Sequence, residues 1–273
     1  MDRRTFLQTM PALMTGLPEP PRRSPVIDVH CHAGRGMHYG AKPDTADPWT
    51  TFNDPRWLLE QADAAGVDRC VIFPITNRTY ERANEEIAEY VRRWPERFIG
   101  FAKHDPVTEA GRIERLLRRE VEEFGLRGLK LHGIPTAEML RTAAELELPV
   151  LVHPPRVAPL VEVARRWPAV NFILAHLGSF ASRDWREHLA AIRAARELPN
   201  LYLETSAVVF FPYLHRAARE VPPEKLLFGS DGPLTDIRVE IHKIKLLQLP
   251  SSHEQLVLGL NAARLLKLET ASR

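Results

Sequence analysis

The pattern that most constrains this fold is a short apolar run followed by an amphipathic stretch, repeated along the chain. Each run is rich in β-branched residues and reads as a strand, and each following stretch has a helical period. Strand–helix alternation predicts a parallel sheet covered by helices. The eight strand-like runs are Val26–Val29, Cys70–Ile75, Phe98–Ala102, Gly128–Leu131, Pro149–Val152, Asn171–Ala175, Leu201–Glu204 and Leu226–Gly229.

The spacing of these runs favours a closed barrel over an open sheet. Between Val26 and Leu226 the seven intervals average roughly 29 residues, which suits a strand–helix unit of ~30 residues. The apolar side chains of Ile113–Phe124 form one stripe, as do those of Leu160–Trp167. No Gly-x-Gly-x-x-Gly loop follows the first run, which argues against a dinucleotide-binding open sheet. We therefore predict an α/β protein, a single (β/α)₈ TIM barrel over residues 26–273.

Composition excludes several classes of partner. A formal net charge of +2 with 26% charged residues gives no reason to expect nucleic acid or an acidic membrane surface. No apolar run approaches the ~20 residues of a transmembrane helix. Two cysteines, Cys31 and Cys70, are too few for a disulfide framework in 273 residues. These observations leave a small-molecule substrate as the expected partner.

Residues 1–25 differ from the rest of the chain. Arg3-Arg4-Thr5-Phe6-Leu7 resembles a twin-arginine export signal, and a weakly apolar stretch from Met10 to Leu17 follows it. That stretch is short, contains Pro11 and lacks an Ala-x-Ala-like cleavage site. The segment is therefore either a signal for export to the periplasm or a disordered arm on a cytoplasmic protein.

Titratable side chains recur where the predicted strands end. His132, His153 and His176 follow the fourth, fifth and sixth strands, and Asp231 follows the eighth. The C-terminal ends of barrel strands meet at one face, where active sites form. Polar groups at equivalent positions of several strands therefore indicate a functional site at this face.

Two further histidines, His30 and His32, follow the first strand. Because side chains alternate along a strand, both should face the barrel mouth while Cys31 packs on the other side. Their imidazoles could bind one divalent cation together with His153 and Asp231. Three neutral imidazoles and one carboxylate are ligands that zinc accepts, and manganese and iron use similar ones.

Several segments together resemble the amidohydrolase superfamily, and in particular its amidohydrolase-related branch, which contains aminocarboxymuconate-semialdehyde decarboxylase. The resemblance spans roughly residues 26–268. It implies one divalent metal on His30, His32, His153 and Asp231, and the ligand types make zinc the first choice. It also implies that His176 acts on the substrate and that Asp231 moves a proton. The matching segments are Ile27–His32, Leu151–His153, Asn171–Gly178, Phe228–Asp231 and the closing helix Leu258–Leu266.

Three functions fit these parts. A metal ion lowers the pKa of a bound water to about 7, so the first hypothesis is a hydrolase of a lactone, amide or ester. The alternative is a non-oxidative decarboxylase of an unsaturated or aromatic acid, because the branch contains both kinds of enzyme. The third is a non-catalytic metal-binding barrel. We also expect that the chain could form a homodimer, by analogy alone with such enzymes.

Four residues are predicted to bind an anionic substrate: Lys130, His132, His104 and Arg35. Lys130 has an alternative role, since binuclear members of the superfamily carry a carboxylated lysine on this strand that bridges two metals. The connection from Ala33 to Pro55 is the longest in the chain, and we predict that it forms a substrate lid.

Overall fold

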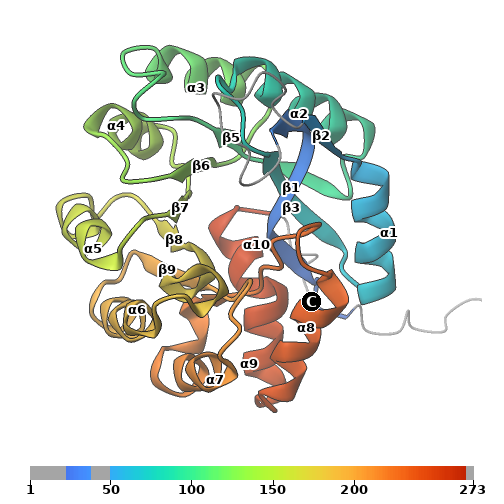
Figure 1. Cartoon of the computed structure of the whole chain (residues 1–273), viewed down its shortest axis with the longest axis vertical. Helices are drawn as coiled ribbons and strands as arrows, with labels where there is room; N and C mark the ends of the chain where they lie inside the picture. The colour runs from blue at the N-terminus through green and yellow to red at the C-terminus, as the bar shows by residue number, and fades with distance from the viewer. Residues whose placement is uncertain (1–22, 38–49, 269–273) are drawn as a thin grey trace, which may run out of the picture.

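The computed structural model describes residues 23–37 and 50–268, and Figure 1 shows a ring of helices around a central set of strands. All eight predicted strand runs contribute to this set. The strands are β1 (Ile27–Met37), β2 (Thr50–Asn53), β3 (Arg69–Pro74), β4 (Phe98–Gly100), β5 (Ala102–Lys103), β6 (Leu129–His132), β7 (Val150–His153), β8 (Phe172–Leu174), β9 (Leu201–Glu204) and β10 (Leu226–Leu227).

Backbone hydrogen bonds join the strands into a closed barrel. β3 pairs in parallel with β1 and β4, and β5 to β10 pair in parallel in chain order. β4 and β5 act as one strand, because Phe101 N between them donates to Ile72 O at 2.9 Å on one side and Ala102 N donates to Gly128 O at 2.9 Å on the other. The ring closes where Val29 N donates to Phe228 O at 3.0 Å. The barrel prediction is therefore confirmed.

Helices follow the strands and cover the outside of the barrel (Figure 1). In α1, Asp54 caps the N-terminus by accepting from Arg56 N at 2.9 Å, and Gly66 ends the helix with a left-handed φ of 72°. The outer helices are α1 (Pro55–Ala65), α2 (Glu81–Arg93), α3 (Ile113–Glu122), α4 (Ala137–Glu145), α5 (Val157–Arg166), α6 (Trp185–Glu197), α7 (Phe211–Glu220) and α8 (Ile237–Leu246).

Apolar side chains form two layers. The outer layer lies between strands and helices and includes Ile113 and Leu117 of the α3 stripe, which are fully buried. The inner layer fills the barrel and includes Val71, Phe101 and Ile173. A C-terminal helical segment closes the end of the barrel at which the strands begin, and its residues Ala262, Ala263 and Leu265 belong to the inner layer. This segment consists of α9 (Ser251–Gln255), the π-helix η4 (Leu256–Leu260) and α10 (Asn261–Leu265). In the described part of the chain, the other end of the barrel, where the strands have their C-termini, is the end that can hold a site.

The predicted lid is in part a hairpin. β1 continues to Met37 and pairs antiparallel with β2, with Gly34 opposite Asn53. The connection therefore starts later than Ala33, and its role as a substrate lid stays a prediction, because residues 38–49 lie outside the described residues. The export signal predicted within residues 1–25 also lies almost wholly outside them. Within the described ranges, no helix is both long enough and apolar enough to cross a membrane.

Candidate metal centre

A break in the regular pairing of β1 brings its two histidines into the barrel. The register with β3 shifts between Asp28 and Cys31. Before the shift Val29 packs in the inner layer, and after it Cys31 packs in the outer layer, so that His30 and His32 face inward. The Asp28 carboxylate fixes this segment by accepting from His30 N at 3.0 Å and Ser230 N at 2.9 Å. The predicted orientation of Cys31 is confirmed.

Asp231 reaches the same point from the turn after β10. Its backbone has a φ of 66°, which few non-glycine residues adopt, and its N–H donates to His30 O at 2.7 Å. The carboxylate oxygen Oδ1 lies 3.2 Å from His30 Nε2 and 3.0 Å from His32 Nε2. His30 and His32, near the start of the barrel segment, and Asp231, near its end, thus meet in one buried cluster.

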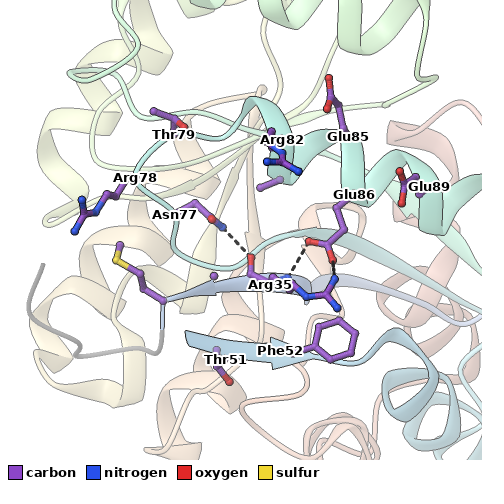
Figure 2. A pocket seen from close by; sticks show the side chains of 13 residues that line it. Arg35, Thr51, Phe52, Asn77, Arg78, Thr79, Arg82, Glu85, Glu86 and Glu89 are labelled. Carbon is purple, nitrogen blue, oxygen red and sulfur yellow. Dashed lines mark hydrogen bonds and ion pairs between the residues drawn. The ribbon is translucent and has the colours of Figure 1, made fainter. Parts of the chain in front are cut away.

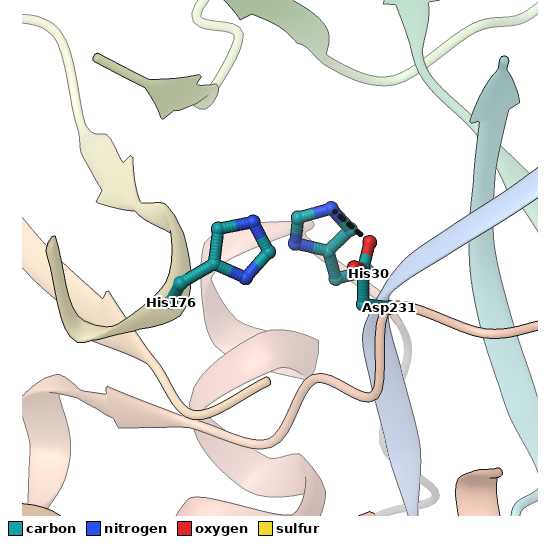
Figure 3. Close-up of side chains that lie close together, drawn as sticks. All are labelled: His30, His176 and Asp231. Carbon is teal, nitrogen blue, oxygen red and sulfur yellow. Dashed lines mark ion pairs between the residues drawn. The ribbon is translucent and has the colours of Figure 1, made fainter. Parts of the chain in front are cut away.

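His176 completes this cluster from the turn that follows β8. Its backbone is left-handed, with a φ of 56°, and its ring centroid lies 4.8 Å from that of His30. Figure 3 shows the His30 and His176 rings side by side, with the Asp231 carboxylate beside His30. Ligand atoms of His30, His176 and Asp231 all lie within 4.8 Å of one another.

Glu204, at the end of β9, is a functional residue that the sequence interpretation missed. Its carboxylate is fully buried and accepts from His30 Nδ1 at 2.9 Å and from His176 N at 2.6 Å. It also accepts from Ser206 Oγ at 2.8 Å, and this hydroxyl lies 2.8 Å from His176 Nδ1. Its position at the end of a strand was the available signal, the same signal that predicted the histidines and Asp231.

These contacts set the tautomers of two imidazoles. A proton on His30 Nδ1 is bound by Glu204, and a proton on His176 Nδ1 is bound by the Ser206 hydroxyl, which itself donates to Glu204. The Nε2 atom of each ring is then the one available as a ligand. A carboxylate behind a metal-binding histidine is a common feature of such sites, because it orients the ring and raises its basicity. The donor set therefore fits a divalent metal ion.

Burial and charge together set the protonation of the cluster. Burial lowers the pKa of His32 to about 3 and that of His176 to about 4, so both rings are neutral at neutral pH. Burial opposes the charge on Asp231, but His30 and the hydrogen bonds from His30 and His32 hold its pKa well below the ordinary value. Burial also opposes the charge on Glu204, but the charge and hydrogen bond of His30, together with His176 and the Ser206 N–H, lower its pKa to about 2. Burial and Lys130 disfavour a charge on His30, yet Glu204 and Asp231 raise its pKa, so a metal ion that binds here displaces the second proton of this ring.

His153, predicted as a ligand, lies at the half-buried end of β7. Its ring centroid is 4.6 Å from that of His176, and the His176 centroid is 4.8 Å from that of His30. Burial, with the charges of His176 and Lys130, lowers its pKa to about 2. The structure thus brings His153 to the cluster, while the division of ligand and catalytic roles between His153 and His176 stays a prediction.

The predicted substrate residues Lys130 and His132 both lie on β6. His132 is exposed at the barrel mouth, and its ring centroid is 5.0 Å from that of His153. Lys130 is fully buried beneath it, and its Nζ has no hydrogen-bond partner among the described residues. Both side chains therefore lie on the cluster side of the barrel, as a substrate contact requires.

His104 does not lie in this site, contrary to the prediction. It is buried, and its ring nitrogens lie 3.2 Å from Glu109 Oε2 and 2.8 Å from Glu120 Oε2. Both nitrogens are thus taken by carboxylates, which leaves neither for a substrate. The residue follows a strand as the others do, but its side chain turns outward to α3.

Arg35 also lies away from the metal cluster. Its guanidinium pairs with Glu86 at 3.2 Å and stacks 4.8 Å from the Phe52 ring centroid. Figure 2 shows these contacts at a surface cavity of about 880 Å³ between the β1–β2 hairpin and α2. Among the described residues that line this cavity there is no member of the metal cluster. The extended β1 carries Arg35 outward, so its predicted role as a substrate contact is not supported.

Comparison with known proteins places this geometry in context. Residues 27–268 match the model of a family described as Amidohydrolase. A gamma-resorcylate decarboxylase from Polaromonas sp. strain JS666 is 25% identical in an alignment 221 residues long, which covers 59% of this chain and 68% of the relative.

Two solved structures share the fold. One is a dihydroxybenzoic acid decarboxylase from Polaromonas sp. JS666 with bound manganese and the inhibitor 2-nitroresorcinol, with a TM-score of 0.65 and 21% identity over 91% of this chain and 98% of that one. The other is a putative 2-pyrone-4,6-dicarboxylic acid hydrolase from Pseudomonas putida, with a TM-score of 0.70 and 18% identity over 91% of this chain and 100% of that one.

Proposed function

Because this chain belongs to the amidohydrolase family, we propose that it is a metal-dependent, non-oxidative decarboxylase of an aromatic carboxylic acid. The observation that carries the proposal is the similarity to a gamma-resorcylate decarboxylase over 59% of this chain. The sequence interpretation put hydrolysis first and decarboxylation second, and the comparisons favour the reverse order.

The metal cluster supplies the groups that this reaction needs. A divalent ion bound there would act as a Lewis acid that orients the substrate and withdraws electron density from it. His30, His32 and Asp231 would hold this ion together with His153 or His176. The described part of the barrel buries His30, His32 and Asp231 to within 3% exposure, which limits the access of bulk water to the reacting carbon.

Decarboxylation requires one proton at the ring carbon that loses its carboxylate. The bond between this carbon and the carboxylate breaks, carbon dioxide leaves, and a carbon–hydrogen bond forms in its place. We assign the proton transfer to Asp231, whose Oδ1 lies at the centre of the cluster. Because this carboxylate is ionised at rest, it first accepts a proton that comes from solvent water and then passes it to the ring carbon. His176 presents Nε2 to the same space, because its Nδ1 is bound to Ser206, and it would orient the substrate.

The identity of the ion is a further part of the proposal. Zinc was the first choice from the ligand types, with manganese and iron as alternatives. A relative with the same fold binds manganese, and we infer that manganese or zinc serves here, with one ion per chain. Metal analysis of the purified protein checks both statements, and two ions per chain would contradict the second.

The test uses protein reconstituted with manganese or zinc and supplied with 2,6-dihydroxybenzoate. We expect one resorcinol and one carbon dioxide per substrate consumed, measured by liquid chromatography and by a coupled carbon dioxide assay. His176→Asn should lower kcat by about 10²-fold or more. The exposed His242→Asn is the matched control and should keep the wild-type rate. Metal binding without turnover of any aromatic acid would contradict the proposal and favour a non-catalytic barrel.

Hydrolysis of a lactone is the second candidate function. The observation that favours it is the likeness of the fold to a putative pyrone dicarboxylic acid hydrolase, with a TM-score of 0.70. Incubation with 2-pyrone-4,6-dicarboxylate separates the two candidates. Ring opening of the pyrone without carbon dioxide release from aromatic acids would restore hydrolysis as the first reading.

A further inference from the structure

Two buried lysines lie next to each other inside the barrel. Lys103 on β5 and Lys130 on β6 are direct partners in the parallel pairing of these strands. Their neighbours Ala102, Leu129 and Leu131 pack in the outer layer, so both lysines point into the barrel. Lys103 is 1% exposed and Lys130 is 0% exposed. Neighbouring strands are separated by ~4.8 Å, so the two side chains start from adjacent points on one wall.

The described residues do not satisfy the hydrogen-bond donors of this pair. Lys103 Nζ donates to Pro74 O at 3.1 Å and lies 5.2 Å from the Tyr80 ring centroid. Lys130 Nζ has no hydrogen-bond acceptor and lies 5.2 Å from the Phe73 ring centroid. An ammonium has three N–H donors, and a buried donor without an acceptor is costly. The pair therefore lacks acceptors that a bound anion would provide.

The pKa values of the two lysines also indicate that an anion would be bound here. Burial lowers the pKa of Lys130 to about 8, and burial together with the charge of Lys130 lowers the pKa of Lys103 well below its ordinary value. An anion that accepts from both ammoniums would offset this penalty.

The pair adjoins the metal cluster. The Phe73 ring lies beneath the Lys130 ammonium, and its centroid is 4.7 Å from the His32 ring centroid and 5.2 Å from the His30 ring centroid. Lys130 precedes His132 by two residues on the same strand face, and His132 is exposed at the mouth. A molecule that enters over His132 and reaches the cluster therefore passes this wall of the barrel.

We propose that Lys103 and Lys130 form a subsite for a second oxyanion of the substrate, so that the substrate is a dianion. One carboxylate goes to the metal cluster, and a second carboxylate or an ionised phenol accepts from the two ammoniums. The assignment of the first carboxylate rests on the proposed function. The subsite itself is independent of which bond the enzyme breaks.

The test compares two unreactive ligands with the metal-loaded protein by calorimetry. Isophthalate carries two carboxylates on one ring and benzoate carries one. We expect the wild type to bind isophthalate at least about tenfold more tightly, since a hydrogen bond to a charged group contributes about that factor. Equal affinities for the two ligands in the wild type would overturn the proposal without recourse to any variant.

The variants Lys103→Met and Lys130→Met test whether the preference for isophthalate over benzoate depends on the two lysines. Each should weaken isophthalate binding by about tenfold, leave benzoate binding within about twofold and keep one metal ion per chain. Lys245→Met, at an exposed lysine of α8, is the matched control and should change neither affinity. An equal loss for both ligands in the barrel variants would also overturn the proposal.

This binding test is separate from the test of the proposed function. A preference for isophthalate that depends on Lys103 and Lys130, without turnover of aromatic acids, would keep the subsite and reject the decarboxylase. Turnover of 2,6-dihydroxybenzoate without this preference would keep the decarboxylase and reject the subsite.

Discussion

At the scale of single residues, the metal cluster depends on Glu204, which itself need not touch the ion. The carboxylate is the common acceptor for His30 Nδ1, His176 N and the Ser206 hydroxyl. Without it, His30 has no partner that keeps its proton on Nδ1, and the ring is free to carry the proton on the ligand nitrogen Nε2 instead. Glu204 is therefore a positioning residue for two imidazoles.

Glu204→Gln should weaken metal binding while the barrel stays folded. An amide can present its NH₂ group to His30, which would favour the wrong tautomer, and such a change behind a metal ligand costs about 10–100-fold in affinity. A titration against a competing chelator measures this loss. Glu197→Gln, at an exposed residue of α6, is the control. Unchanged affinity in Glu204→Gln would show that the tautomers are set in another way.

At the scale of elements, His104 ties β5 to the helices outside it. Its Nε2 meets Glu120 on α3, and its Nδ1 meets Glu109 in the preceding loop. Asn84 on α2 donates to Glu120 Oε1 at 2.7 Å and to Lys103 O at 3.1 Å, which extends the network to a third element. A residue predicted to bind substrate thus serves as a buried cross-link.

This cross-link should make stability depend on pH. Burial disfavours the charge on His104, but Glu109 and Glu120 outweigh it and raise the pKa to about 9, from 6.5 for an ordinary histidine. A raised pKa in the folded state stabilises the fold fully below about 6.5, and this contribution is lost as the pH rises through about 9. Urea unfolding should therefore show a decline in the free energy of unfolding across this range.

His104→Gln isolates the contribution. At pH 7 it should lower the free energy of unfolding by about 3 kcal/mol, because it leaves two buried carboxylates without their cation. The difference from the wild type should shrink between pH 6.5 and 9. The exposed His242→Gln serves as control. A difference that stays constant over this range would mean that His104 is not charged in the folded protein.

At the scale of the whole molecule, a bound ion would join the two edges at which the barrel closes. His30 and His32 belong to β1, and Asp231 follows β10, so their cluster spans the junction where Val29 N donates to Phe228 O. The residues joined here are about 200 positions apart in the chain.

Metal should therefore stabilise the entire fold. A ligand that binds only the folded state at a concentration of 100 times its Kd adds about 2.7 kcal/mol to the free energy of unfolding. Thermal unfolding with manganese and then with an excess of chelator measures this gain and its reversal. His30→Ala should unfold at the same temperature with or without the ion. An equal gain in this variant would place the stabilising ion elsewhere.

The fold could be predicted from the sequence because its signals are local. A strand run such as Cys70–Ile75 is apolar throughout because both of its faces are buried, and each helix has one apolar stripe because one of its faces is buried. The cluster was predictable for the same reason, since a polar residue directly after a strand lies at the C-terminal face. The hydrophobic effect acts on each segment separately, so the repeat itself determined the barrel.

Contacts between segments could not be predicted in this way. The pairing of β1 with β2, the outward turn of His104 to Glu120, and the position of Arg35 beside Glu86 each depend on a partner distant in the chain. The proposed roles of Glu204 and Lys103 depend on the side chains that packing brings next to them, and these neighbours cannot be predicted from local sequence. The sequence by itself determined which polar residues follow the barrel strands, because the strand and helix patterns are local. Only the tertiary structure decided which of them face the mouth and meet there, because hydrogen bonds and ion pairs are made between elements.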